Sequence, residues 1–420
     1  MWHPAQEIRI IGADRKVGNS MKLIHCADLH LDSKMESHLS KEQAKQRKTE
    51  LLETYMNMVD YAETNGVSAV LIAGDLFDKK VIGVHAKKTV MDTIRQHPDI
   101  NFYYLQGNHD LSGFISNQEK SNRDADHTTE DTNAAENIVN GVEKDTEGSE
   151  LPKNLYTFSE HWQSYILGTS EKGNIVLTGV ELNADNQNTI YETLLLRPQD
   201  FNIVTLHGQL AKYKPKDHVE VIDLGALRNK SIDYLALGHV HSYEEGQLPP
   251  RGVYCYPGCL EGRGFDETGE HGFVLLDINE ESLTMQRTFV PFAKRNFYAV
   301  PVDVSACLST TEMLPLVEKA LNDCEANPKD LVKIVLTGNV DVNCEKNPVL
   351  IVSRFKDRYH YLRVKDETKV AVHYTDFRND KSLKGELVRL LEEDSSLSED
   401  EKSAIIRVGL QALNGEQIEL

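Results

Sequence analysis

The sequence predicts an α/β protein whose first part is built on sheets buried on both faces. Two kinds of segment alternate along residues 21–290. Continuous apolar runs, such as "VSAVLIAGD" at 67–75 and "FNIVTLHG" at 201–208, are typical of strands covered on both sides. Between such runs, residues 41–64 and 85–96 repeat apolar side chains at three- and four-residue spacing, which predicts helices. Further strands are expected at 21–25, 100–110, 174–182, 232–239, 252–258 and 271–278.

Composition and charge restrict the class of protein. The chain has 420 residues, 40% of them hydrophobic and 27% charged, which is ordinary for a globular protein of two or three domains. No run approaches the ~18 consecutive apolar residues of a membrane span. The N-terminus has no pattern of a secretion signal, and the six cysteines form no CxxC pair, so we expect a cytoplasmic protein with reduced thiols. A net charge of −20 means that any nucleic-acid role needs metal ions or a partner's positive surface.

Residues 117–150 differ from the rest. They contain ten Asp and Glu, three Lys and Arg, and almost no bulky apolar side chains. Such a segment cannot bury enough surface to offset the entropy lost on ordering, so the default expectation is a disordered surface insertion. The alternative is an acidic lid that competes with DNA at a neighbouring site.

The last third of the chain has a separate organisation. Residues 291–378 combine strand and helix patterns and predict a small α+β domain. Residues 379–420 carry two amphipathic helical patterns, with Leu387, Leu391, Ile406 and Leu410 as an apolar stripe and an N-cap signal in "SSLSEDE". This stripe either folds back on the preceding domain or contacts a partner.

Polar side chains follow nearly every predicted core strand at its carboxyl end. Ligands of open α/β sheets bind at these ends, so we expect the groups to converge. Two neighbouring histidines alone, as in "GHVH", are more often ordinary core or solvated side chains; the other strand ends strengthen the functional interpretation. The converging residues are Asp28, His30, Asp75, Asn108, His109, Asp110, His207, His239 and His241.

Carboxylate, imidazole and amide groups together suit divalent ions such as Mn, Fe or Zn rather than a thiolate site. Two such ions a few ångströms apart can hold both oxygens of a phosphoester displacement. Asp75 has two oxygens and can bridge both ions. Glycines before Asp75, Asn108 and His239 allow close approach of the backbone.

The blocks D-x-H, G-D, G-N-H-D, H and G-H-x-H, in this order, resemble the calcineurin-like metallophosphoesterases. The longer runs "MKLIHCADLHLDS", "GDLFD" and "YPGCLEGRGFDETGEHGF" are similar to SbcD-type DNA repair exonucleases, in particular the YhaO-like bacterial branch. The resemblance implies a four-layer α/β/β/α sandwich at 21–290, a capping domain at 291–378 and a partner-binding helical segment at 379–420. Residues 1–20 precede the usual start of this family, which indicates a tail or a mis-assigned start.

The resemblance also implies roles for the site residues. Asp28, His30, Asp75 and His241 would surround one ion, and Asp75, Asn108, His207 and His239 the other. His109 would be the catalytic acid, with Asp110 orienting it. Arg263 is a candidate contact to substrate phosphate, with a structural salt bridge as the alternative. The chain reads "DLHLDS" where many relatives have D-x-H-L-G, so contacts at the rim of the site are expected to differ.

The implied function is a Mn-dependent DNA exonuclease or endonuclease subunit in DNA repair, with Fe, Zn or Mg as alternative ions. The expected partners are DNA and an SbcC-like, SMC-type ATPase; the chain is expected to form a homodimer, to lie in the cytoplasm with the nucleoid, and to bind no membrane. One alternative is a metallophosphoesterase acting on nucleotides or other phosphoesters. Another is a catalytically weak scaffold that binds DNA ends for the ATPase.

Overall fold

The computed structural model describes residues 7–10, 20–33, 35, 39–78, 82–107, 110, 151–211, 220–341, 344–371 and 380–414. These residues fall into two compact units. Unit 1 comprises Met1–Arg263 and Glu270–Lys294, and unit 2 comprises Gly264–Gly269 and Arg295–Leu420. The main change from unit 1 to unit 2 comes after Lys294. The short segment Gly264–Gly269, which belongs to unit 2, was not anticipated.

One sheet of unit 1 has six strands in the order β15-β14-β2-β3-β4-β5. Strands β2, β3, β4 and β5 are parallel to one another, and β14 pairs antiparallel with both of its neighbours, β2 and the edge strand β15. Every residue of β3 is buried, as the continuous apolar run predicted. The strands are β2 (Ser20–Cys26), β3 (Ala69–Ala73), β4 (Asn101–Leu105), β5 (Leu155–Thr157), β14 (Gly272–Asn279) and β15 (Thr284–Pro291).

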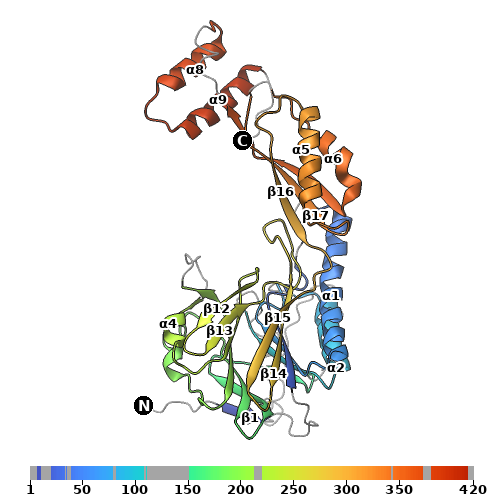
Figure 1. Cartoon of the computed structure of the whole chain (residues 1–420), viewed down its shortest axis with the longest axis vertical. Helices are drawn as coiled ribbons and strands as arrows, with labels where there is room; N and C mark the ends of the chain where they lie inside the picture. Colours follow the sequence, from blue (N-terminus) through green and yellow to red (C-terminus); the bar gives the residue numbers. More distant parts are fainter. Residues whose placement is uncertain are drawn as a thin grey trace, which may run out of the picture. The chain divides into compact units, whose positions relative to one another are not determined.

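Two helices pack on this six-stranded sheet. Helices α1 (Lys41–Thr64) and α2 (Val84–Gln96) lie side by side, and their apolar faces share one hydrophobic core with the sheet (Figure 1). Ser40 caps α1: its hydroxyl accepts a hydrogen bond from the Gln43 amide, and the Gln43 side chain accepts from the Ser40 amide. Both helices lie where the periodicity predicted them.

The second sheet of unit 1 has seven strands in the order β1-β6-β7-β8-β11-β13-β12. Part of residues 1–20, the segment expected to be a tail or a mis-assigned start, forms β1 (Glu7–Ile10), which pairs in parallel with β6 at the sheet edge. The other strands are β6 (Gln163–Thr169), β7 (Asn174–Gly179), β8 (Phe201–His207), β11 (Tyr234–Gly238), β12 (Glu244–Leu248) and β13 (Gly252–Tyr256).

The two sheets face each other across a shared hydrophobic core. Leu23, Leu71 and Tyr103 from the six-stranded sheet pack with Ile203 and Tyr234 from the seven-stranded sheet. On its outer face the seven-stranded sheet packs against η2 (Ile190–Thr193) and α4 (Leu224–Leu227). The order helix, sheet, sheet, helix is the four-layer arrangement that the family resemblance implied.

Unit 2 contains a small parallel sheet of β16 (Phe297–Asp303), β17 (Leu331–Thr337) and β19 (Tyr361–Asp366). One face packs on α5 (Thr310–Asp323) and α6 (Pro348–Phe355), which lie together beside the strands (Figure 1). A two-stranded ladder of β18 (Asn339–Asp341) and β20 (Lys369–Ala371) follows.

The C-terminal patterns form α8 (Leu383–Glu393) and α9 (Glu399–Asn414). The predicted cap is present: Ser398 Oγ accepts from the Glu401 amide, and the Glu401 carboxylate accepts from the Ser398 amide. The predicted contact stripe for a partner is wrong, because Ile406 and Leu410 are buried between the two helices. Helix α9 also contacts β20. The exposed large apolar side chains described in α8 and α9 are Leu383, Leu390, Ile405 and Leu413.

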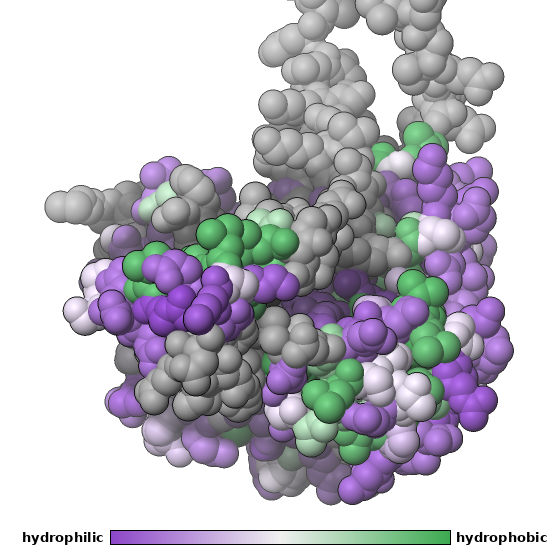
Figure 2. Space-filling model, turned by 90° about the horizontal axis from the view of Figure 1, so that it is seen from above, coloured by the Kyte–Doolittle hydropathy of each residue, from purple (hydrophilic) through white to green (hydrophobic). Residues whose placement is uncertain are grey.

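The described surface is mainly hydrophilic on the face shown in Figure 2, where hydrophobic residues form small separate groups. Among the described helices, none is both long enough and apolar enough to cross a membrane. The acidic segment 117–150 lies outside the described residues.

Candidate metal centre

Four neighbouring strands carry the predicted ligands of unit 1 at their carboxyl ends. Asp28 and His30 follow β2, and Asp75 follows β3, in the six-stranded sheet. His207 ends β8, and His239 and His241 follow β11, in the seven-stranded sheet. The two sheets therefore contribute to one centre. Asp28, His30, Asp75 and His207 are buried.

These side chains form two groups with the geometry of metal ligands. The ligand atoms of Asp28, His30 and His241 all lie within 4.8 Å of one another, and so do those of Asp75, His207 and His239. Each group combines carboxylate oxygen with imidazole nitrogen, a donor set that suits Mn, Fe or Zn. The residues present thus fit two divalent ions.

Asp75 joins the two groups. Its Oδ2 atom lies 3.4 Å from His207 Nε2 in one group and 3.8 Å from His30 Nε2 in the other. Within the group of Asp28, His30 and His241, the two Nε2 atoms of His30 and His241 are 3.2 Å apart. A carboxylate between two sets of imidazoles is the arrangement expected of a bridging ligand.

Glycines, which have no side chain, allow the strand ends to approach each other this closely. A Cβ on Gly238 would lie 1.8 Å from the Ala73 carbonyl oxygen, and a Cβ on Gly107 would lie 2.2 Å from Asp75 Oδ1. Neither distance is possible for real atoms. The glycines before Asn108 and His239 are therefore required for the reason predicted from the sequence.

The backbone holds the ligands in uncommon conformations. Asp28, His30 and Asp75 have positive φ angles of 52°, 44° and 50°, and that of His239 is 105°. Hydrogen bonds between the strand ends maintain them: the Asp28 amide donates to the Gly74 carbonyl at 3.1 Å, and the His30 amide to the Asp75 carbonyl at 2.9 Å. The His239 amide donates to both oxygens of Asp28. Strain of this kind persists where the surrounding structure imposes it, as in functional sites.

Burial and charge separate the pKa values of two histidines. Burial alone would lower the pKa of His207, but Asp75 and Asp28 beside it raise that pKa to about 10. His239 is also desolvated and lies near His207, and its pKa falls to about 4. Asp75 and Asp28 thus favour positive charge beside His207, whether a proton or a metal ion carries it.

Asp110 stabilises the loop that follows Asp75. Its carboxylate accepts from the Phe77 amide at 2.8 Å, the Gly107 amide at 2.9 Å and the Leu76 amide at 3.3 Å. Burial and then the charge of Asp75 raise the pKa of Asp110 to about 6. Asn108 and His109 lie outside the described residues, so their predicted roles, and that of Asp110 toward His109, stay predictions.

Asp78 is a site residue that sequence reasoning missed. Its Oδ1 lies 3.3 Å from His30 Nδ1, and its Oδ2 accepts from Ser33 Oγ at 2.7 Å. A carboxylate beside Nδ1 fixes the orientation of the ring and so directs Nε2 toward the metal position, the usual support for a histidine ligand. The signal was present as the last residue of "GDLFD".

Arg263 lies at this same edge of the centre. Its guanidinium is 3.5 Å from Asp78 Oδ1 and 3.2 Å from His241 Nδ1. The structural ion pair considered for Arg263 is therefore present, and the guanidinium also neighbours His241, a predicted ligand.

The departure from D-x-H-L-G has a structural consequence at Asp32. Asp32 has a positive φ of 68°, a conformation that favours glycine. Its carboxylate accepts from the Gly83 amide at 2.8 Å and pairs with Lys48. The aspartate thus links the loop after β2 to the start of α2.

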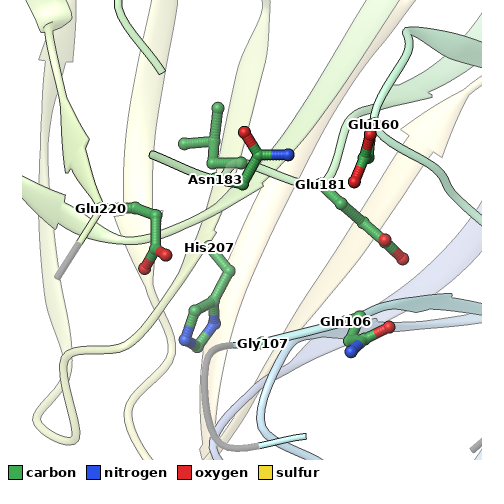
Figure 3. Close-up of a pocket in the computed structure, with 8 residues that line it drawn as sticks. Gln106, Gly107, Glu160, Glu181, Asn183, His207 and Glu220 are labelled. Atoms are coloured by element: carbon green, nitrogen blue, oxygen red, sulfur yellow. The ribbon is translucent and has the colours of Figure 1, made fainter. Parts of the chain in front are cut away.

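A pocket of about 180 Å³ adjoins the centre at His207. Figure 3 shows the side chains around it, from several different segments. Three of these residues are glutamates. Burial, and to a smaller extent the negative charge of Glu160, raises the pKa of Glu181 to about 7. A pocket of this charge disfavours additional phosphate groups. The lining residues are Gln106, Gly107, Glu160, Glu181, Leu182, Asn183, His207 and Glu220.

The chain is similar to several known proteins. The sequence model of the calcineurin-like phosphoesterases matches residues 21–243. The uncharacterized metallophosphoesterase YhaO of Bacillus subtilis is 26% identical over 76% of this chain and 72% of that protein. The DNA double-strand break repair protein Mre11 of Aeropyrum pernix is 24% identical over 67% of this chain and 64% of its own length. A solved structure, a dimetal phosphatase from Danio rerio, aligns with a TM-score of 0.35 at 12% identity, over 64% of this chain and 99% of that one.

Proposed function

The chain belongs to the calcineurin-like phosphoesterase family, and from that premise we propose that it is a metal-dependent DNA phosphodiesterase that acts in DNA repair. The observation that carries the proposal is the position of Asp75 Oδ2 between two sets of imidazoles. The similarity to a DNA double-strand break repair protein supports DNA as the substrate. The similarity to YhaO supports the SbcD-type, YhaO-like assignment within the family.

The residues of the chain would divide the chemistry among them. Asp28, His30 and His241 would hold one ion and Asp75, His207 and His239 the other, with Asn108 completing the second set. Two divalent ions supply positive charge that stabilises the charge developing on the phosphate. His109 would protonate the leaving oxygen. Asp78 and Arg263 would keep His30 and His241 oriented.

We propose manganese as the native ion and an SMC-type ATPase as the partner, in a homodimer located in the cytoplasm at the nucleoid. The net charge of −20 supports the need for a partner, since this chain repels DNA at a distance. The exposed Leu383 and Leu390 of α8 offer apolar surface for such a contact.

A phosphoesterase acting on nucleotides or other small phosphoesters is the second candidate. The acidic pocket beside His207 favours it, because three glutamates there suit a compact substrate better than a polyanion. A DNA-end-binding scaffold is less well supported, because binding alone does not require two sets of metal ligands.

The test is a nuclease assay on end-labelled linear DNA with the full-length protein, titrated with Mn²⁺, Mg²⁺ and a chelator. Bis-p-nitrophenyl phosphate and mononucleotides serve as parallel substrates. Metal-dependent release of labelled products supports the proposal. Hydrolysis of the small substrates alone would establish the second candidate, and DNA binding without hydrolysis of any substrate would establish the scaffold.

A further inference from the structure

Among the described residues of unit 2, helices α5 and α6 pack on one face of the small parallel sheet and no helix packs on the other. Side chains alternate along each strand, and those that face α5 and α6 form the hydrophobic core of the unit. The intervening positions form the opposite face. There Ala299, Lys333 and Arg363 stand in one row across the three strands, and Pro301, Val335 and Lys365 stand in the next.

This opposite face concentrates positive charge. Lys333 and Arg363 are half-buried neighbours, and the Lys365 side chain is 51% exposed. Burial first, and then the charges of Lys365 and Arg363, lower the pKa of Lys333. The three cations thus lie close enough to repel one another, in a chain whose net charge is −20.

Two of these cations, Lys333 and Arg363, lie over the same aromatic ring and are called the two central cations below. Phe265, from the segment Gly264–Gly269, packs edge-on against Phe297 with ring centroids 5.1 Å apart. Lys333 Nζ lies 5.2 Å from the Phe265 centroid and Arg363 Cζ lies 5.9 Å from it. A cation over a ring is stabilised by roughly 0.5–1 kcal/mol at exposed sites. One cation would be enough to stabilise the packing of Phe265, so the second needs another explanation.

Carboxylates do not neutralise the two central cations. Asp266 and Glu367 are near enough to influence Lys333, but among the described residues no carboxylate lies within ion-pair distance of Lys333 or Arg363. Glu367 instead pairs with Lys365 at 2.6 Å, in an exposed pair of the kind that is worth little. The hydrogen-bond donors of Lys333 and Arg363 thus remain available to an external anion.

We propose that this face, made by Lys333, Arg363 and Lys365 and called the basic face below, binds the phosphodiester backbone of a nucleic-acid strand. Arg363 and Lys365 are two residues apart on β19, about 6.6 Å along the strand, which is close to the separation of phosphates in an extended chain. The inference rests on the proposed function, since it assigns a second contact surface to the same DNA substrate. It gives an acidic protein a local site where DNA binding is electrostatically favourable.

The experiment measures binding of a fluorescent oligo-dT to full-length protein in chelator, over a range of salt concentrations. The test variant is Lys333→Gln with Arg363→Gln. The matched control is Lys319→Gln with Arg354→Gln, which removes two exposed cations from α5 and α6 on the other side of the same sheet. A third variant, Lys333→Arg with Arg363→Lys, keeps both charges.

Two lost phosphate contacts should reduce the slope of log affinity against log salt by about 1.4, at ~0.7 per contact for single strands. The control and the charge-keeping variant should retain the wild-type slope. All variants should hydrolyse bis-p-nitrophenyl phosphate at the wild-type rate, which shows that the fold and the metal centre are intact.

Three outcomes would overturn the inference. If the test variant binds with the wild-type slope while wild-type protein cleaves DNA, the basic face is not a contact and the proposed function stands. If wild-type protein neither binds nor cleaves DNA but hydrolyses the small diester, both proposals are wrong. If a poly-glutamate peptide, and not DNA, loses affinity in the test variant, the occupant is an acidic protein segment.

Discussion

At the scale of single residues, Asp75 is the most informative position. Because its Oδ2 lies between both ligand groups, Asp75→Asn should weaken both, and the loss of several kcal/mol of charge stabilisation corresponds to at least about 10³-fold in turnover. Turnover of bis-p-nitrophenyl phosphate, metal content and circular dichroism together measure this. Wild-type turnover at unchanged metal content would show that the two-ion assignment is wrong.

His109 is predicted to act as an acid and not as a ligand. His109→Gln should therefore retain two bound ions and lose roughly 10²–10⁴-fold in rate, the usual contribution of general acid catalysis. Elemental analysis of the purified variant distinguishes the two roles. A protein with only one ion would reassign His109 as a ligand.

Asp78 is expected to act through His30. Asp78→Asn weakens the acceptor on His30 Nδ1, so metal affinity should fall roughly 10–100-fold, while the rate at saturating metal changes much less. Metal titrations of activity measure both quantities. The matched control is Asp92→Asn, which removes an exposed carboxylate paired with Arg95 on α2. Equal metal affinity in the two variants would contradict this positioning role.

These residues also show what the sequence can and cannot reveal. The convergence of the predicted ligands could be foreseen because each follows a recognisable strand, and strand ends converge. Asp78 was overlooked although it ends the run "GDLFD", because its importance depends on contacts with Ser33 and with Arg263, which is distant in the chain. Asp32 was visible only as a departure from a family pattern, and its pairing with Lys48 required the fold.

At the scale of elements, strongly periodic segments were predicted well and edge strands poorly. Helix α1 spans the predicted range, and β3 and β8 are continuous buried runs. Strands β12 and β15 were missed because they lie at sheet edges with alternating exposure and polar sequences such as "EEGQL". The helices of the tail were predicted, but which face each one buries depends on their mutual packing.

The exposed leucines of α8 provide a sharp test of partner binding. Leu383→Ser with Leu390→Ser should keep the fold and phosphodiesterase activity but reduce co-purification with the proposed SMC-type ATPase at least tenfold. Ile406→Ser, at a buried position of α9, should instead destabilise the tail, because it introduces a polar group and a cavity.

Thermal unfolding and pull-down experiments on the same preparations separate these effects. Truncation at Lys381 should also abolish co-purification while activity on short substrates remains. Because α9 contacts β20, unfolding of the truncated chain would indicate that the tail belongs to the core of unit 2. Full co-purification of the double serine variant would exclude the α8 surface as the contact.

At the scale of the whole molecule, charge is expected to control access of DNA. Segment 117–150 contributes a net −7, so its deletion changes the chain from −20 to −13. If the segment is an acidic lid, its deletion should raise DNA affinity, and most strongly at low salt, where repulsion is least screened. Replacement by a neutral Gly–Ser segment of equal length should have the same effect. Unchanged affinity at every ionic strength would indicate a passive insertion.

The path of the chain between the two units has a consequence for biosynthesis. Gly264–Gly269 belongs to unit 2 but leaves the ribosome before β14 and β15, which complete the six-stranded sheet of unit 1. Phe265 is therefore synthesised well before its neighbours Phe297 and Tyr361. Until β16 emerges, Phe265 lacks the ring of Phe297 to pack on, and a nascent chain that stalls near Lys294 displays this segment to chaperones.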